Sequence, residues 1–182
     1  MKVVIPGGSG QIGQVLARSF LAAGHEVVVL SRGGPRERGT VAWDGRTLGA
    51  WAKEVDGADA VINLAGRSVN CRYHKANLTE MLASRIDSTR AVARAVEAAS
   101  RPPRVWLQAS TATIYAHRFD APNDETTGII GGDEPDAPAA WRFSIDIARA
   151  WEAAQTDAPT PATRKVAMRT TMVMSPERGG IF

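Results

Sequence analysis

Short apolar runs alternate with longer amphipathic stretches from the start of the chain. Residues 2–5 form one apolar run and residues 26–30 form another. Between them, residues 11–23 place hydrophobic side chains at helical spacing, and Gly24 follows directly. Apolar runs of this length are typical of strands, and a 3.6-residue period is typical of a helix. This part of the chain therefore predicts a strand, a helix and a second strand.

The same alternation continues to the end of the sequence. A short third strand is expected at Val41 and Trp43. Three further strands are expected at residues 58–64, 104–109 and 165–170, and two helices at residues 78–99 and 139–155. Strands that alternate with helices form a parallel sheet covered on both faces. The pattern thus predicts an α/β fold with a doubly wound parallel sheet, as one domain over residues 1–182.

One segment, residues 117–140, carries no periodic pattern. It reads "HRFDAPNDETTGIIGGDEPDAPAA" and is rich in proline, glycine and acidic residues. Structureless loops of such length are uncommon inside compact domains and usually have a function. We therefore expect this segment to form a lid loop within the domain.

Composition narrows the classes of function. The chain has 182 residues, with 22 basic and 19 acidic side chains and a net charge of +3. The basic residues are scattered and the aromatic residues do not interleave with them, which argues against nucleic-acid binding. The single cysteine, Cys71, cannot form an internal disulfide, and no signal peptide or membrane-spanning run is visible. These features predict a soluble cytoplasmic protein with a small-molecule ligand.

The stretch "VVIPGGSGQIGQ" holds the first candidate for chemistry. Gly8, Gly10 and Gly13 form G-x-G-x-x-G, and Gly7 comes directly after the first strand. Glycines in this setting allow a tight turn and a close approach of the backbone to a pyrophosphate at the helix start, which Gln11 and Ile12 open. The strand before the loop and the helix after it favour a dinucleotide-binding (Rossmann) loop over a glycine turn that binds nothing.

The end of the second strand distinguishes the cofactors. An acidic residue there binds the ribose 2′-hydroxyl of NAD, whereas a basic residue accommodates the 2′-phosphate of NADP. Ser31 and Arg32 occupy this place, and Arg36 and Arg38 follow. The sequence therefore favours NADP over NAD, while an ordinary solvated loop of arginines remains the alternative.

Three stretches together resemble the extended branch of the short-chain dehydrogenase/reductase superfamily. The stretch "ADAVINLAGRSV" resembles the N-x-A-G signature of its fourth strand, "LQASTATIYAH" resembles its fifth strand, and "VAMRTTMVMSPERGGIF" resembles its sixth strand with the loop that follows. The resemblance implies a cofactor contact for Asp44, which would read the adenine amino group. It also implies cofactor contacts at the ends of the fourth and fifth strands, at Leu64, Ala65, Gly66 and Ala109.

The fifth-strand signature carries the candidate catalytic groups. In the superfamily this strand ends in a catalytic serine or threonine four residues before a tyrosine. The resemblance places Thr111 at that hydroxyl, with Ser110 and Thr113 as neighbours.

A narrower resemblance covers essentially the whole chain. The stretches "DGADAVINLAGRSVNCRYHKANLTEMLASRIDSTR", "PPRVWLQASTATIY" and "AWEAA" are similar to the atypical subgroup of sugar-nucleotide-epimerase-like proteins of unassigned substrate. The resemblance implies an NADP-dependent epimerase or oxidoreductase that acts on a sugar nucleotide or another polar metabolite. Related folds often pair through the helices expected here at residues 78–99 and 139–155, which suggests a homodimer.

The chain departs from the superfamily at the catalytic tyrosine and lysine. The usual Tyr-x-x-x-Lys does not occur, and the corresponding positions fall on Ser144 and Ala148. Neither side chain replaces a phenol or an ammonium, and general acid/base catalysis is worth roughly 10²- to 10⁴-fold. Either another group has taken over, or the protein binds or senses NADP(H) with weak catalysis. Replacement candidates are Tyr73, His74 and Lys75, for which a solvated polar loop is the alternative.

The chain also departs in length. Family members continue into a C-terminal lobe that forms much of the substrate site, whereas this chain stops at "GGIF". We expect either a fragment of a longer protein or a fold that has lost this lobe.

A metal site and a further basic residue on the long helix are the remaining candidates. The histidine and acidic residues lack the ligand spacing of a zinc site, so no metal is expected. Arg85, on the long helix, has two expected partners. One is a phosphate or carboxylate group of the substrate, and the other is a surface acid such as Asp87.

Overall fold

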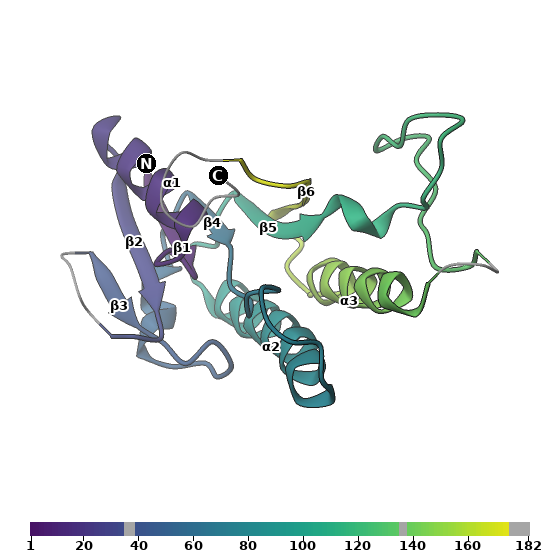
Figure 1. Cartoon of the computed structure of the whole chain (residues 1–182). Helices are drawn as coiled ribbons and strands as arrows, with labels where there is room; N and C mark the ends of the chain where they lie inside the picture. The colour runs from purple at the N-terminus through teal and green to yellow at the C-terminus, as the bar shows by residue number, and fades with distance from the viewer. Residues whose placement is uncertain (35–38, 135–137, 175–182) are drawn as a thin grey trace.

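Six parallel strands form one sheet, in the order β3-β2-β1-β4-β5-β6 (Figure 1). The computed structural model describes residues 1–34, 39–134 and 138–174. The strands are β1 (Lys2–Pro6), β2 (Glu26–Ser31), β3 (Thr40–Ala42), β4 (Ala60–Asn63), β5 (Val105–Thr111) and β6 (Arg164–Thr170). The chain builds outward from β1 to β3, returns beside β1 and builds outward again to β6. This is the predicted doubly wound sheet, whose carboxyl edge at the point of return forms a ligand crevice.

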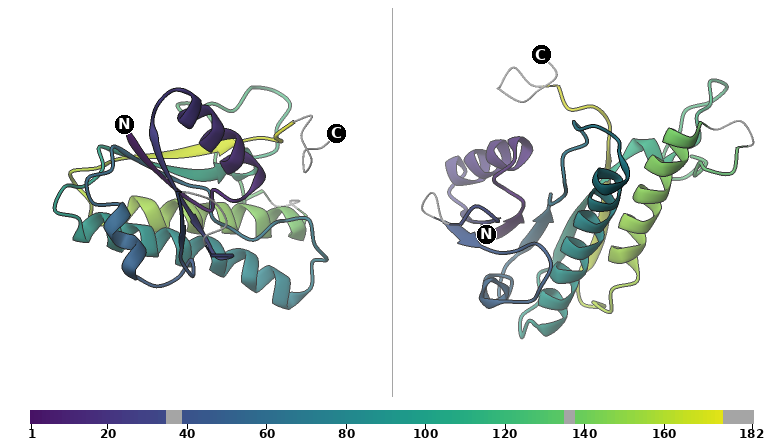
Figure 2. Two further views of the ribbon diagram at one scale, coloured as in Figure 1. Left: turned by 90° about the vertical axis from the view of Figure 1, so that its left-hand side faces the viewer. Right: turned by 60° about the horizontal axis from the view of Figure 1, so that its bottom comes forward.

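Helices cover both faces of the sheet (Figure 2). On one face, α1 (Gln11–Ala22) packs Leu16 and Phe20 against the odd-numbered side chains of β1. On the other face, α2 (Lys75–Ala98) and α3 (Ala139–Thr156) lie side by side. Two short 3₁₀ helices, η1 (Ala50–Glu54) and η2 (Ala112–Ile114), were not predicted from the sequence.

The larger core lies between the sheet and α2. Val4, Val61 and Trp106 from the strands are fully buried against Val92 and Val96 of α2. Each such side chain stabilises the fold by about 1.5–3 kcal/mol. The core therefore fixes the strands rigidly, and with them the positions of the loops at their carboxyl ends.

Most boundaries shift by one or two residues from the prediction, such as β4 at 60–63 where 58–64 was expected, and three of the differences have a clear local reason. The long helix begins at Lys75 and not at residue 78, because the His74 imidazole caps it by accepting a hydrogen bond from the Asn77 amide at 3.4 Å. Strand β5 continues to Thr111 because its pairing with β6 extends that far. Trp43 lies just beyond β3, where it packs edge-on against Trp51.

Some predicted features fall on residues 35–38, 135–137 and 175–182, which lie outside the described residues. These residues include Arg36, Arg38, part of the 117–140 loop and the terminal "GGIF". The structure therefore describes Arg32 but not Arg36 or Arg38. Within the described ranges, no helix is both long enough and apolar enough to cross a membrane.

Candidate functional site

The glycine loop is packed so tightly that side chains are excluded from it. Gly7 has a φ of 76°, and a Cβ there would lie 2.7 Å from the Ala65 amide nitrogen. A Cβ on Gly13 would collide with the backbone of Gly8. The loop therefore brings β1, the start of α1 and the loop after β4 into direct contact. Gly8 serves this packing and does not itself line a cavity.

Helix α1 starts at this loop with Gly10 as its N-cap. The first hydrogen bond inside the helix runs from the Gln14 amide to the Gly10 carbonyl at 2.9 Å. Backbone amides of a first helical turn have no acceptor within the helix, and the helix dipole adds positive potential there. The end of α1 at the carboxyl edge of the sheet is thus suited to a pyrophosphate.

A cavity of about 240 Å³ lies between this loop and the ends of β2 and β3. Eight of the residues predicted to bind the cofactor line it: Gly7, Gly10, Ser31, Arg32, Asp44, Leu64, Ala65 and Gly66. The Ser31 hydroxyl donates a hydrogen bond to that of Ser9 at 3.2 Å. Arg32 is exposed, and none of the described carboxylates forms an ion pair with it. Its guanidinium is available for an anion at this end of the groove.

Asp44 organises the turn after β3. Its carboxylate accepts hydrogen bonds from the Thr47 hydroxyl and amide and from the Arg46 amide, at 2.5, 2.9 and 2.8 Å. These bonds, led by that of the Thr47 hydroxyl, lower the pKa of Asp44 to about 2. Asp44 is therefore a carboxylate at neutral pH, anchored at the rim of the cavity.

A second cavity of about 610 Å³ continues from the first, sharing Gly7, Gly10 and Leu64 with it. It is lined by four further predicted cofactor residues and by three of the candidate catalytic residues: Gln11, Ile12, Gly13 and Ala109, with Ser110, Thr111 and Tyr73. The structure thus brings the predicted cofactor residues other than Gly8 together along one groove with Ser110, Thr111 and Tyr73. The groove follows the carboxyl ends of β1, β2, β4 and β5.

Asn63 has a structural role that its motif alone did not reveal. It is fully buried, its amide nitrogen donates to the Gln108 side chain at 3.0 Å, and its oxygen accepts from the Ala65 amide at 3.1 Å. Asn63 therefore shapes the loop that carries Ala65 and does not face the groove itself.

The two candidate hydroxyls at the end of β5 differ in their surroundings. Ser110 is buried, and its hydroxyl donates to the Glu152 carboxylate at 2.5 Å. The Thr111 hydroxyl is hydrogen-bonded to that of Thr113 at 2.9 Å, at the surface of the second cavity. Among the described residues, the Thr111 hydroxyl thus has only another hydroxyl as its side-chain partner, whereas the Ser110 hydroxyl ties the strand end to α3.

Sequence analysis missed a polar network centred on Arg169. Its guanidinium binds Glu152 through two hydrogen bonds of 2.9 and 2.8 Å and donates a third, of 2.8 Å, to the Tyr115 hydroxyl. Because Arg169 acts as the donor, the phenol keeps its own proton for another acceptor.

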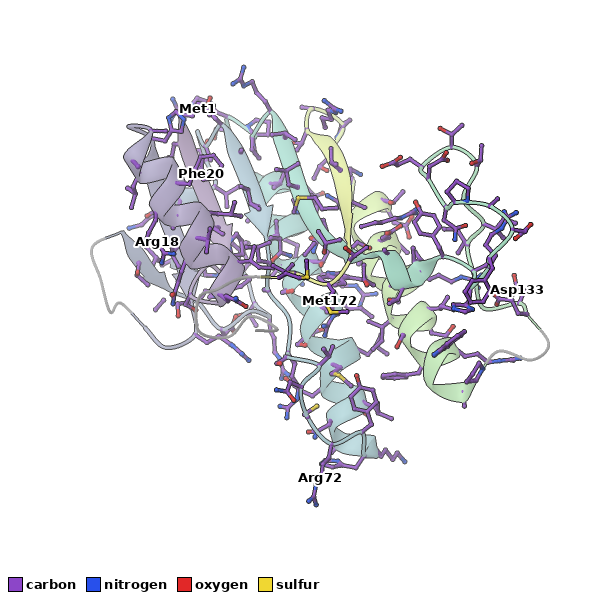
Figure 3. All side chains as sticks on the ribbon, turned by 45° about the horizontal axis from the view of Figure 1, so that its top comes forward. Met1, Arg18, Phe20, Arg72, Asp133 and Met172 are labelled. Atoms are coloured by element: carbon purple, nitrogen blue, oxygen red, sulfur yellow. The ribbon has the colours of Figure 1, made fainter. Side chains whose placement is uncertain are left out.

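A third cavity, of about 1150 Å³, adjoins the groove at its far end. It shares Thr111, Thr113, Ser144 and Thr171 with the second cavity, so the two open into each other. Tyr115 and Arg169 line its floor near the sheet. Figure 3 shows this side of the molecule, with Met172 beside the sheet and Asp133 on the outlying loop.

The described part of the 117–140 segment forms one wall of the third cavity and has internal structure. Asp124 accepts hydrogen bonds from the amides of Thr126 and Thr127, and the segment returns to pair Ile130 with Tyr115 in an antiparallel bridge. His117, Asn123, Asp124 and Glu134 of this segment line the cavity.

The candidates for the missing acid/base occupy different positions. Tyr73 lines the second cavity together with Thr111 and Ser144. The imidazole of His74 caps α2, and neither His74 nor Lys75 lines a described cavity. Ala148 is fully buried. Among the described residues, no three histidine, cysteine or acidic side chains form a metal-binding group.

Residues 3–158 match the model of the NAD dependent epimerase/dehydratase family. The chain belongs to this family. The match covers the glycine loop, helices α1, α2 and α3, and the end of β5. This match confirms the predicted membership in the extended short-chain dehydrogenase/reductase superfamily.

Similar family members are longer than this chain. The chain is 33% identical over 183 residues to the epimerase family protein SDR39U1 of Bos taurus, and the match covers 99% of the chain but 56% of that protein. The human protein of the same name is likewise 33% identical over 99% of the chain. The chain thus spans about half the length of these relatives.

Solved structures agree with the fold. The human epimerase family protein SDR39U1 (isoform 2), solved with NADPH, superposes with a TM-score of 0.81 at 31% identity, over 100% of this chain and 57% of that one. A nucleoside-diphosphate sugar epimerase from Corynebacterium glutamicum gives a TM-score of 0.72 at 28% identity, over 96% and 34% of the two chains.

Proposed function

We propose that this family member binds NADP(H) and acts as an oxidoreductase or epimerase on a polar small molecule such as a sugar nucleotide. The observation that carries the proposal is the continuous groove from Arg32, past the glycine loop, to Thr111. This groove has a phosphate-binding helix start in its middle and a presented hydroxyl at one end. The human relative solved with NADPH supports the same cofactor.

Arg32 is the proposed determinant of NADP over NAD. It lies at the end of β2 beside Ser31, on the rim of the 240 Å³ cavity. A guanidinium here compensates the charge of a 2′-phosphate, whereas no acidic side chain follows β2 directly to bind a free 2′-hydroxyl. Asp44 would accept a hydrogen bond from the adenine amino group at the same end.

The third cavity is the proposed substrate site. It opens into the groove at Thr111, so a substrate in it would meet the nicotinamide end of the cofactor. Its size suits a molecule larger than a simple alcohol. The 117–140 segment forms its outer wall, and we assign to this segment the role of a lid.

Tyr73 is the proposed acid/base, with Thr111 beside it. Bound NADP⁺ would supply the hydride acceptor for a substrate alcohol. As a phenolate, Tyr73 would take the proton from the substrate oxygen in oxidation, and as a phenol it would return that proton in reduction, while the Thr111 hydroxyl would hold the same oxygen by a hydrogen bond. Both side chains line one cavity, which supports placing them at the same substrate.

A second candidate function is an NADP(H)-binding protein with weak catalysis that senses the cofactor. The observation that favours it is that Ser144 and Ala148 stand where the superfamily carries its tyrosine and lysine. A protein of this kind would bind the cofactor but give no turnover that depends on Tyr73.

The first test is calorimetric titration of NADPH and NADH into the purified chain. Binding of NADPH in the micromolar range, with NADH much weaker, supports the proposal. Failure to bind either nucleotide overturns it. Sedimentation of the same sample tests the homodimer, proposed to form through α2 and α3.

The second test addresses catalysis. Sugar nucleotides and other polar carbonyl compounds are screened for oxidation of NADPH by its absorbance. Tyr73→Phe should lower kcat by roughly 10²- to 10⁴-fold with NADPH affinity unchanged, whereas Lys75→Met, which changes a neighbour outside the cavities, should not. Full activity of Tyr73→Phe would remove Tyr73 from the mechanism, and turnover of none of the compounds would favour the sensing function.

A further inference from the structure

Arg85 places a positive charge inside the second cavity. The residue lies on α2 and lines the cavity together with Tyr73 and Ser144. Its guanidinium lies over the Trp151 ring, 4.9 Å from the centroid, and donates one hydrogen bond of 2.9 Å to the Met81 carbonyl. A guanidinium stacked on a ring keeps the donors along its edge available for in-plane hydrogen bonds.

Among the described residues, Arg85 lacks an acidic partner of the kind that five other arginines have. Arg46, Arg104, Arg118, Arg149 and Arg169 each form an ion pair with an aspartate or glutamate. In the part of the chain that the structure describes, no carboxylate forms an ion pair with Arg85. The partner suggested by the sequence, Asp87, instead lies 3.6 Å from Arg46.

The surroundings of Arg85 make its charge costly in the absence of a ligand. Burial lowers the pKa of Arg85, and the nearby Tyr73 opposes this effect. Arginine nevertheless stays protonated in proteins, so the charge persists in a partly desolvated position without a counter-ion. An anion that enters the cavity would supply the missing counter-ion.

We propose that Arg85 binds an anionic group, a phosphate or a carboxylate, of the ligand that occupies the second cavity. The inference rests on the proposed function, because that function makes this cavity the nicotinamide end of the cofactor groove. The guanidinium edge matches the two oxygens of either anion. Two sources can supply the anion: the dinucleotide itself, or a negatively charged substrate bound beside it.

The position of Trp151 adds a second argument. Trp151 follows Ala148 by three residues on α3, so both residues lie on one face of that helix. The guanidinium over Trp151 therefore brings a cation to the side of α3 that carries Ala148. This is the position at which the superfamily has its lysine. Arg85 provides this cation from α2, a different helix.

Calorimetry tests the proposal with inorganic phosphate and with acetate as probes. Each anion is titrated into the protein alone and into the protein saturated with NADPH, and NADPH is titrated separately. The variants are Arg85→Met, which keeps an apolar stem on Trp151, and Arg85→Lys, which keeps the charge without the planar edge. Arg90→Met is the matched control, because Arg90 is an exposed arginine on the same helix.

Three results would be decisive. If Arg85→Met weakens binding of an anion to the NADPH-saturated protein by about tenfold or more, with NADPH affinity unchanged, the anion belongs to the substrate. If it weakens NADPH binding itself by that factor and phosphate competes with NADPH in the wild type, the anion belongs to the cofactor. If Arg85→Met equals the wild type in every titration, or if Arg90→Met loses as much, the proposal is wrong.

Two controls separate this proposal from the others. If the wild type does not bind NADPH, the proposed function is wrong. The anion titrations into the protein alone would still test Arg85 in that case. If Arg85→Met does not fold, as judged by its thermal melt, Arg85→Lys takes its place. Arg85→Lys should then bind the anion severalfold more weakly than the wild type, and unchanged binding would contradict the assigned contact.

Discussion

The Arg169 guanidinium forms a two-point ion pair with the Glu152 carboxylate, and this pair joins β6 to α3 at the carboxyl edge of the sheet. Ser110 donates to the same carboxylate, and Tyr115 accepts from the same guanidinium. The pair therefore holds both ends of the segment that presents Thr111. Arg169 of this pair lines the third cavity, and Ser110, which donates to Glu152, lines the second.

The first prediction concerns the stability of this pair against acid. Burial alone would raise the pKa of Glu152, but the hydrogen bonds from Arg169 and Ser110 outweigh it and lower the pKa below its ordinary value. A carboxylate whose pKa is lowered by folding stabilises the protein above its unfolded pKa, about 4.3 for glutamate, and this stabilisation is lost as the pH falls through the folded pKa.

Glu152→Gln should therefore destabilise the protein by about 1–3 kcal/mol at neutral pH, and by less as the pH falls below about 4. Urea unfolding of both proteins across this range measures the difference. Glu97→Gln, a change at an exposed position on α2, is the control and should leave stability within about 0.5 kcal/mol. A Glu152→Gln effect that does not change with pH would contradict the lowered pKa.

The second prediction concerns cofactor selection by Arg32. Arg32→Ser should weaken NADPH binding about tenfold or more, because the 2′-phosphate would lose a charge-assisted contact. NADH lacks that phosphate, so its affinity should stay nearly unchanged. Calorimetry with both nucleotides on this variant and on Arg90→Ser separates the local contact from a general effect of charge. Equal losses for NADPH and NADH would remove Arg32 from the role of selector.

The order of strands and helices was predictable from the sequence, because apolar runs and helical periods reflect burial against a sheet. The place of the groove was predictable from strand direction. A glycine loop that directly follows a strand lies at the carboxyl end of that strand, which is the ligand edge of a parallel sheet. Leu64 and Ala109 are far apart in the chain but both lie near this edge, because Leu64 follows β4 and Ala109 lies two residues before the end of β5.

Side-chain partners were not predictable, since they depend on contacts across elements. Ser110 and Thr111 are neighbours of similar chemistry, yet only the three-dimensional packing shows that Ser110 points to Glu152. The alternative partners of Arg85 were open in the sequence because Asp87 is close in the chain. The structure directs Asp87 to Arg46 and leaves Arg85 in the groove.

The third prediction tests the packing of the glycine loop. Gly13→Ala should destabilise the protein by about 1–3 kcal/mol and abolish NADPH binding, because its Cβ would meet the Gly8 backbone, which cannot move aside without displacing β1. Gly10→Ala is the comparison, since a Cβ there would come no closer than 3.4 Å to the Gly7 carbonyl oxygen. Thermal melts and NADPH titrations should show the larger loss for Gly13→Ala. The opposite order would mean that the loop is looser than its contacts indicate.

The last prediction concerns Asn63, whose side chain connects the buried Gln108 side chain to the Ala65 amide. Asn63→Ala leaves the Gln108 side chain and the Ala65 amide without their partner, which should cost about 1–3 kcal/mol in the free energy of unfolding. Part of this cost should disappear when Gln108 is also replaced, because an apolar pair has no polar group to leave unsatisfied. A double-mutant cycle of Asn63→Ala and Gln108→Ala should therefore show a coupling of about 0.5–3 kcal/mol.

The same cycle bears on function when NADPH binding is measured beside stability. Gln108 contacts Asn63 but not the loop after β4, whereas Asn63 holds that loop through the Ala65 amide. Asn63→Ala should thus weaken NADPH binding more than Gln108→Ala does, even where the two variants are equally destabilised. Equal NADPH affinities in the two variants would show that the loop keeps its shape without Asn63, and that the asparagine of this motif acts on stability alone.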